Sequence, residues 1–122
     1  MTTQKPGQRT IGDITPKLAD LTDEVLYADV WERPALSKRD RSLITVAALL
    51  ALYRDAELDL HLGLALDNGV TADELAELAT HLAFYAGWPC SVKAAHRLRD
   101  ILRDRLDPPA GTSSADSSTP QP

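Results

Sequence analysis

Residues 71–89, TADELAELATHLAFYAGWP, carry the clearest structural signal in this chain. Thr71 and Glu74 have the spacing of a capping box, in which two side chains satisfy backbone N–H groups at the start of a helix. Apolar side chains then recur on one helical face, and Gly87 is typical of a residue that ends a helix. That face consists of Leu75, Leu78, Ala79, Leu82 and Ala86. The stretch predicts an amphipathic helix that starts at Thr71 and continues to Gly87.

Similar start and stop signals predict three further helices. Pro16 is suited to the first helical position, where its missing N–H costs nothing, and Ser37 is a good N-cap. Pro34 disfavours a helical conformation at the residue before it, so residues 31–34 form a connector. These helices are predicted over residues 15–27, 37–52 and 89–106.

One segment between these helices has an ambiguous pattern. Its leucines alternate with other residues, which by itself predicts a strand: Leu58, Leu60, Leu62, Leu64 and Leu66. The run lacks β-branched and aromatic residues, however, and Asp55 and Gly69 frame it as an N-cap and a residue after a helix. We therefore predict a helix, which makes five helices and an all-α fold. Its leucines would occupy most of the circumference, so we expect burial on several sides, including by a second subunit.

The composition is that of one globular domain. The chain has 122 residues, of which 43% are hydrophobic and 25% charged. Both ends are polar and contain Gly and Pro without an apolar run, a composition typical of disorder. We expect a flexible N-terminal arm over residues 1–13, a helical domain over residues 14–106 and a disordered tail over residues 107–122.

The charge and cysteine content exclude several classes of protein. A net charge of −5 counts against a general nucleic-acid binder. No segment is apolar enough for a signal peptide or a membrane span. The single cysteine, Cys90, excludes an internal disulfide framework and an intramolecular CxxC redox pair, and we expect it to be a buried small residue. A cytoplasmic location fits these features best.

Two Glu–His pairs are the candidates for acid–base chemistry. Glu77 and His81 are four residues apart on the helix that starts at Thr71, so the carboxylate can hold one imidazole nitrogen and leave the other free. Tyr85 extends the same face. Glu57 and His61 repeat the spacing in the leucine-rich segment. A surface helix with an incidental pair, and a core histidine satisfied by its neighbouring carboxylate, are the alternatives.

Other polar residues give weaker signals. Arg33, Arg39 and Arg41 surround the start of a helix, and a guanidinium group can bind a carboxylate through two hydrogen bonds. A metal site is not predicted, because neither HExxH spacing nor a Cys/His cluster is present. The last predicted helix has a basic face, which we interpret as a solvated surface. Its members are Lys93, Arg97, Arg99, Arg103 and Arg105.

Several of these strings together resemble the carboxymuconolactone decarboxylase family. The resemblance covers about residues 14 to 104. The matching strings are VWERPALSKRDRSL at residues 30–43, Glu57-Leu58 with His61-Leu62, Ala65-Leu66, Asn68-Gly69-Val70-Thr71, Glu74-Leu75 with Glu77-Leu78, and HLAFYAGWP at residues 81–89.

The resemblance implies an AhpD-like helical bundle of five to six helices, assembled into homo-oligomers that are commonly trimers or hexamers. The implied activity is decarboxylation of γ-carboxymuconolactone to the enol-lactone of β-ketoadipate in aromatic degradation, without a cofactor. A related lyase or isomerase acting on another unsaturated lactone or carboxylic acid is an alternative. A non-catalytic ligand-binding homologue is a third.

The sister branch of peroxidases uses a CxxCxxxH motif. Counting back from His61, the two cysteine positions are occupied by Arg54 and Glu57, so both redox thiols are absent. This departure argues against peroxidase chemistry and leaves a carboxylate four residues before the histidine.

For the decarboxylase activity, the hypothesis from the sequence assigns a role to each candidate residue. His81, oriented by Glu77, is the general acid, and Glu57 with His61 is an alternative acid or a proton relay. Substrate carboxylates are held by Arg33 and Arg41, and the pocket wall is shaped by Tyr85 and Trp88.

Overall fold

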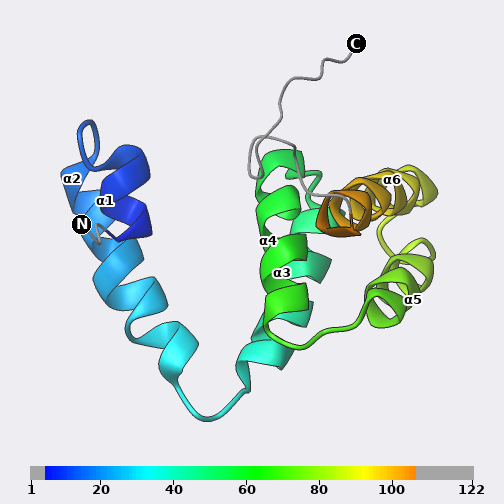
Figure 1. Cartoon of the computed structure of the whole chain (residues 1–122), viewed down its shortest axis with the longest axis horizontal. Coiled ribbons are helices and arrows are strands. Elements are labelled where there is room, and N and C mark those ends of the chain that lie inside the picture. Colours follow the sequence, from blue (N-terminus) through cyan, green and yellow to red (C-terminus); the bar gives the residue numbers. More distant parts are fainter. Residues whose placement is uncertain (1–4, 107–122) are drawn as a thin grey trace. The chain divides into compact units, whose positions relative to one another are not determined.

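The computed structural model describes residues 5–106 and confirms the all-helical fold, with no strand in that range (Figure 1). The predicted tail at residues 107–122 lies outside the described residues, as do residues 1–4. The chain divides into two compact units with their boundary between Arg41 and Ser42. We call these the N-terminal unit and the C-terminal unit. The boundary falls inside the single domain that was expected over residues 14–106.

The N-terminal unit begins with a helix where the sequence predicted a flexible arm. Helix α1 (Pro6–Ile11) starts at a carboxylate from a later helix: Asp23 accepts hydrogen bonds from the backbone N–H groups of Gly7 at 2.7 Å and Gln8 at 3.0 Å. Gly7 is needed at this contact, since a Cβ there would lie 2.6 Å from the carbonyl oxygen of Ala19. The capping residue is 16 positions away, so no local pattern signals this helix.

The rest of the N-terminal unit follows the predicted helix and connector. α2 (Pro16–Asp20) continues directly into η1 (Leu21–Tyr27), a π-helix, so the predicted segment 15–27 is helical but changes its hydrogen-bond pattern part of the way along. A short 3₁₀ helix, η2 (Val30–Glu32), follows. Arg33 is extended, with φ −68° and ψ 137°, as expected for the residue before Pro34.

The C-terminal unit contains most of four long helices. α3 (Lys38–Ala51) begins just before the unit boundary, and Ser37 Oγ accepts a hydrogen bond from the Asp40 N–H at 3.0 Å, as the N-cap prediction requires. α4 (Asp55–Asp67) confirms that the leucine-rich segment is a helix. Its N-cap is Arg54, without a side-chain cap, so the assignment of Asp55 to that position was wrong by one residue.

The end of α4 and the start of α5 are both specified by residues close to them in the sequence. Gly69 has a φ of +101°, and its N–H and that of Val70 bond to the carbonyl oxygens of Leu66 and Ala65, the pattern of a Schellman motif. α5 (Ala72–Leu82) then starts with the predicted capping box, in which Thr71 and Glu74 exchange hydrogen bonds.

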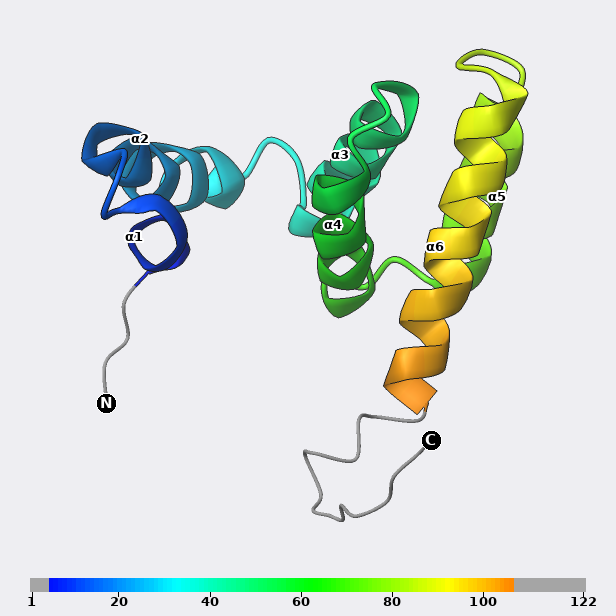
Figure 2. The same cartoon turned by 90° about the horizontal axis from the view of Figure 1, so that it is seen from above.

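α5 ends earlier than the sequence predicted. It stops at Leu82, and residues 83–86 form a turn before Gly87, which has a φ of +117°. Within this turn the N–H groups of Phe84 and Tyr85 bond three residues back, so the chain tightens before the glycine reverses it. α6 (Trp88–Leu106) begins and ends where the sequence places the last helix. Figure 2 shows α5 and α6 running side by side.

The core of the C-terminal unit takes side chains from all four of its helices. In α4 the fully buried leucines are Leu58 and Leu62, each 2% exposed, whereas Leu60 is 57% exposed. The core cluster comprises Val46, Leu50, Leu58, Leu62, Ala65, Val70, Leu75, Ala79, Cys90, Ala94 and Leu98. Within the C-terminal unit, therefore, α4 is not buried on every side. Cys90 is 3% exposed and sits in this core, as the sequence predicted.

Ion pairs join α4 to α6 in a regular series. Lys93 bonds Asp55 at 3.1 Å, Arg97 bonds Asp59 at 3.1 Å, and Arg105 bonds Asp67 at 3.0 Å. The basic face is largely exposed, as the sequence predicted, and these three residues also pair with aspartates of α4 that lie 38 positions earlier, which the sequence did not predict. Each pair is partly exposed, so each contributes on the order of 0–1 kcal/mol to stability. No helix within residues 5–106 combines the length and hydropathy that a membrane crossing requires.

Candidate functional site

The first predicted pair, Glu57 and His61, lies on α4 one helical turn apart. His61 is half-buried and Glu57 is exposed. Burial lowers the pKa of His61 below its ordinary value, because desolvation disfavours the charged imidazolium, and the nearby Glu57 carboxylate opposes the shift. His61 is thus biased toward its neutral form, with one carboxylate within electrostatic range. The expectation of a carboxylate buried among leucines is not met, because Glu57 points to the exposed side.

The second pair lies on α5, where Glu77 and His81 are both exposed. His81 stacks against Tyr85, with ring centroids 4.9 Å apart and an interplanar angle of 30°. Tyr85 belongs to the turn after α5, so the early end of that helix does not separate the two rings. Within residues 5–106 no hydrogen bond links Glu77 to His81. The two side chains are neighbours one turn apart on α5, without a direct bond.

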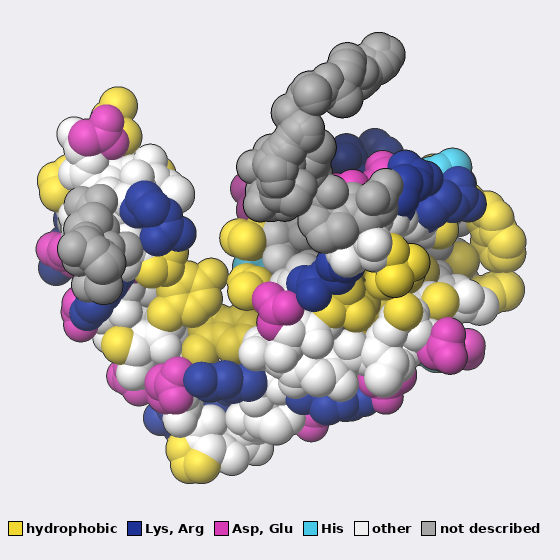
Figure 3. Space-filling view, viewed as in Figure 1, with side chains coloured by type: hydrophobic (Ala, Val, Ile, Leu, Met, Phe, Trp, Pro, Cys, Tyr) yellow, Lys and Arg dark blue, Asp and Glu magenta, His cyan; other side chains and the backbone are white. Residues whose placement is uncertain are grey.

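An exposed aromatic cluster surrounds this turn. Phe84 and Trp88 pack edge to face with ring centroids 5.5 Å apart. The exposed fractions of Phe84, Tyr85 and Trp88 are 74%, 78% and 60%. In Figure 3, yellow hydrophobic side chains lie at the surface at the end of the C-terminal unit that holds the α5–α6 turn. The two predicted wall residues, Tyr85 and Trp88, are therefore both accessible to a ligand or to another protein surface.

The predicted carboxylate-binding arginines lie in the N-terminal unit. Arg41 Nη2 donates a hydrogen bond to the Arg33 carbonyl oxygen at 3.1 Å, which ties the first turn of α3 to the connector before it. The Arg33 side chain is exposed and Arg41 is half-buried. The structure thus brings the backbone of one arginine to the side chain of the other.

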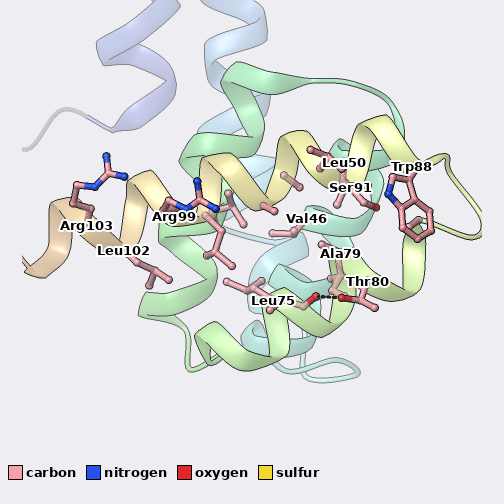
Figure 4. Close-up of a pocket in the computed structure, with 18 of the residues that line it drawn as sticks. Val46, Leu50, Leu75, Ala79, Thr80, Trp88, Ser91, Arg99, Leu102 and Arg103 are labelled. Atoms are coloured by element: carbon pink, nitrogen blue, oxygen red, sulfur yellow. Dashed lines mark hydrogen bonds between the residues drawn. The ribbon is translucent and has the colours of Figure 1, made fainter.

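The structure also contains an apolar groove that the sequence analysis did not predict. It has a volume of about 690 Å³ and lies between α5 and α6, with α3 contributing Val46 and Leu50 (Figure 4). Trp88 and Ser91 lie at one end in Figure 4, and Arg99, Leu102 and Arg103 lie toward the other. Thr80, another lining residue, donates its hydroxyl to the Ala76 carbonyl oxygen at 2.9 Å.

Two polar residues of this groove were not among the candidates. Ser91 is 7% exposed, and its Oγ has no hydrogen-bond partner in the described part of the chain. Arg99 belongs to the predicted basic face, is exposed as expected, and also lines the groove. A local signal did exist: Ala76, Thr80 and Ala83 recur at helical spacing along α5 and its C-cap, and all three are small residues that line the groove. No group of three or more His, Cys, Asp or Glu residues within residues 5–106 is arranged to hold a metal ion.

Comparison with known proteins adds independent information on this chain. The model of the carboxymuconolactone decarboxylase family matches residues 16–100. A 4-carboxymuconolactone decarboxylase of Acinetobacter baylyi is 40% identical over 94 residues, which cover 77% of this chain and 70% of that protein. A nitrosuccinic acid decarboxylase of Metarhizium robertsii is 34% identical over 88 residues, which cover 72% of this chain and 62% of that protein.

Proposed function

Because the chain belongs to the carboxymuconolactone decarboxylase family, we propose that it is a carboxy-lyase that converts 4-carboxymuconolactone to the enol-lactone of β-ketoadipate. The observation that carries this proposal is the 40% identity to a 4-carboxymuconolactone decarboxylase over 77% of the chain. The second relative is also a decarboxylase, which supports the reaction class.

The chemistry of the proposed reaction needs no external electron acceptor. The bond from the γ-carbon to the carboxylate breaks, CO₂ leaves, and the electron pair is delocalised through the conjugated lactone as a dienolate. A proton is then added to carbon. The protein must hold the carboxylates, stabilise the oxyanion and supply that proton. The proposed enzyme therefore works without a cofactor.

The proton donor in this proposal is His81. Its ring is exposed, which leaves it accessible to substrate, and stacking against Tyr85 restricts its orientation. Glu77 lies one turn earlier on the same helix and is the residue proposed to orient the His81 ring. His61 with Glu57 is the alternative donor or relay. The lowered pKa of His61 leaves less imidazolium available near neutral pH, which supports the choice of His81.

Arg33 and Arg41 are the proposed carboxylate-binding residues, with Tyr85 and Trp88 as wall residues. A guanidinium group remains charged at every working pH and can donate two hydrogen bonds to one carboxylate. Arg33 is exposed, so its guanidinium is available for this role. Arg33→Lys tests the two-bond requirement, because lysine keeps the charge but not the planar pair of donors.

A second candidate substrate class is favoured by a specific observation. The fungal relative is named for decarboxylation of nitrosuccinic acid, an acid in which a nitro group, instead of a lactone, can accept the electron pair. The two relatives are thus named for decarboxylation of carboxylic acids with different electron acceptors. A lyase or isomerase acting on another activated carboxylic acid is the alternative for this chain, followed by a non-catalytic ligand-binding role.

Turnover of 4-carboxymuconolactone by purified protein tests the proposal. The ultraviolet absorbance of the substrate is followed with catalytic enzyme in buffer containing a chelator, and nitrosuccinic acid is assayed in parallel by CO₂ release. We expect rapid conversion of the lactone. Conversion of nitrosuccinic acid alone would select the second candidate, and turnover of neither with tight binding of dicarboxylates would support the ligand-binding role.

The assembly and the cellular location complete the proposal. We expect a homo-oligomer, either a trimer or a hexamer, because many large apolar side chains are exposed in the single chain, among them Leu60 at 57% and Phe84 at 74%. The single cysteine and the proposed small-molecule substrate fit a cytoplasmic enzyme with no nucleic-acid or membrane partner.

A further inference from the structure

Two exposed rings at the turn between α5 and α6 form a corner. Phe84 and Trp88 pack with their ring centroids 5.5 Å apart and an interplanar angle of 80°, so the two ring planes are almost perpendicular. Both residues are mostly exposed, Phe84 at 74% and Trp88 at 60%. Rings left in water contribute little hydrophobic stabilisation, and grouped exposed rings mark a surface that meets a ligand or a partner. We call Phe84 and Trp88 the aromatic corner.

The backbone places the aromatic corner in the same short segment as the proposed proton donor. In the turn after α5, the Phe84 N–H bonds the His81 carbonyl oxygen at 3.3 Å, and the Ala86 N–H bonds the Leu82 carbonyl oxygen at 2.7 Å. The ring of His81 stacks on that of Tyr85, the residue next to Phe84, with centroids 4.9 Å apart. Both ring pairs therefore belong to residues 81–88 and lie at the same turn.

The chemistry of the proposed decarboxylation makes a flat ring from one that is not flat throughout. In 4-carboxymuconolactone the γ-carbon that carries the carboxylate is tetrahedral. When the bond to CO₂ breaks, that carbon becomes trigonal and joins the conjugated plane of the lactone. A flat ring can lie face to face on one wall of the aromatic corner and point its edge at the other, which are the two arrangements that aromatic rings favour. The corner therefore fits the dienolate better than the substrate.

We propose that Phe84 and Trp88 are specificity-determining residues, which select a flat conjugated ring that carries a carboxylate and stabilise the dienolate by stacking. This selection rests on the proposed function and adds Phe84 to the residues of the site. Contacts that strengthen toward the transition state increase kcat. An acyclic acid such as nitrosuccinic acid, which names the fungal relative, forms no flat ring when it loses CO₂. The aromatic corner therefore favours the lactone over the second candidate substrate.

Two ligands that differ in the shape of their ring test this selection without turnover. In 2-furylacetate the ring is flat and conjugated, as in the dienolate, whereas tetrahydrofuran-2-acetate has the same skeleton with a saturated, puckered ring. Isothermal titration calorimetry with the full chain measures the Kd of each. We expect 2-furylacetate to bind about three- to tenfold more tightly, the range expected for one aromatic contact. Equal Kd values would overturn the inference.

Matched substitutions separate the effect of a ring from that of apolar bulk. Phe84→Leu removes the ring but keeps an apolar side chain, whereas Phe84→Tyr keeps the ring. Tyr53→Leu is the control, because it removes a ring that is 51% exposed at the turn between α3 and α4. With folding checked by circular dichroism, we expect Phe84→Leu to abolish the ligand preference and to lower kcat for the lactone about three- to tenfold, with KM changed less. Phe84→Tyr should keep the preference, and Tyr53→Leu should behave as the unaltered chain.

The outcomes separate this selection from the proposed function. Turnover of the lactone with equal binding of the two ligands, or with kcat and preference unchanged in Phe84→Leu, would overturn the role of the aromatic corner and leave the decarboxylase activity standing. Preference for the flat ligand without turnover would overturn the activity and support the selection of flat rings, whereas neither binding nor turnover would overturn both. A lower mass of Phe84→Leu in light scattering, with the preference retained, would show that the corner packs against another chain instead of a ligand.

Discussion

Removal of the Asp23 carboxylate should open helix α1. The side chain is 3% exposed and accepts hydrogen bonds from the N–H groups of Gly7 at 2.7 Å and Gln8 at 3.0 Å. Each bond to a charged acceptor contributes about 1.5–3 kcal/mol, but the freed N–H groups regain water when a helix this short opens. We therefore expect Asp23→Ala to lower the free energy of opening α1 by about 2–3 kcal/mol, or about 30-fold or more in its opening equilibrium.

Amide hydrogen exchange measures this change directly. The Arg9 N–H bonds the Lys5 carbonyl oxygen at 2.9 Å, so its exchange reports the opening of the first turn of α1. Asp20→Ala is the matched control: its Oδ1 accepts only from the Gln8 side chain, at 2.9 Å, in an exposed bond whose loss should cost less than about 0.5 kcal/mol. Equal protection of Arg9 in the two variants would refute the account of how α1 forms.

Three further changes probe the site and the core. His81→Ala should lower kcat for the proposed decarboxylation by about 10²–10⁴, while His61→Ala keeps more activity; the reverse order in steady-state kinetics would move the proton donor to α4. The pKa of His61 measured by NMR should lie below its ordinary value of 6.5, and because the unfolded chain then binds the proton more tightly, stability should fall as pH drops below about 6.5. His61→Phe should flatten this part of the urea stability profile, and an unchanged slope would contradict the assignment. Leu62→Ala, at a site 2% exposed, should cost about 2–5 kcal/mol in urea unfolding, whereas Arg97→Ala should cost less than about 1 kcal/mol; similar values for both would contradict the burial described here.

The sequence predicted the helices of the C-terminal unit well because their signals are local. The capping box of Thr71 and Glu74 lies at the start of α5, and the left-handed Gly69 lies at the end of α4. Each signal acts within one turn of the helix end that it specifies. The secondary structure of α4 was harder to predict, because leucines that alternate with other residues favour a strand. The helical propensity of its residues decided in favour of the helix. The end of α5 was missed by several residues because the turn at residues 83–86 keeps apolar side chains at nearly helical spacing.

The candidate site was less predictable than the fold. Spacing alone identified both Glu–His pairs, but it could not separate the half-buried His61 from the exposed His81. Burial of one imidazole depends on which neighbouring helices cover that face. The ion pairs between α6 and α4 could not be predicted for the same reason, because charges that pair across helices have the same sequence pattern as charges in water.

By itself, the sequence determined that the five predicted segments are helical, where most of them begin and end, and to which family the chain belongs, but it missed helix α1. Those properties depend on contacts within a few residues and on short strings of side chains. Only the tertiary structure decided that Asp23 caps a helix 16 positions earlier, that three aspartates of α4 meet basic residues 38 positions later, and that α5 and α6 leave an apolar groove between them. The physical reason is that these contacts arise only when folding brings distant segments together, and no local pattern records which partner a side chain will meet.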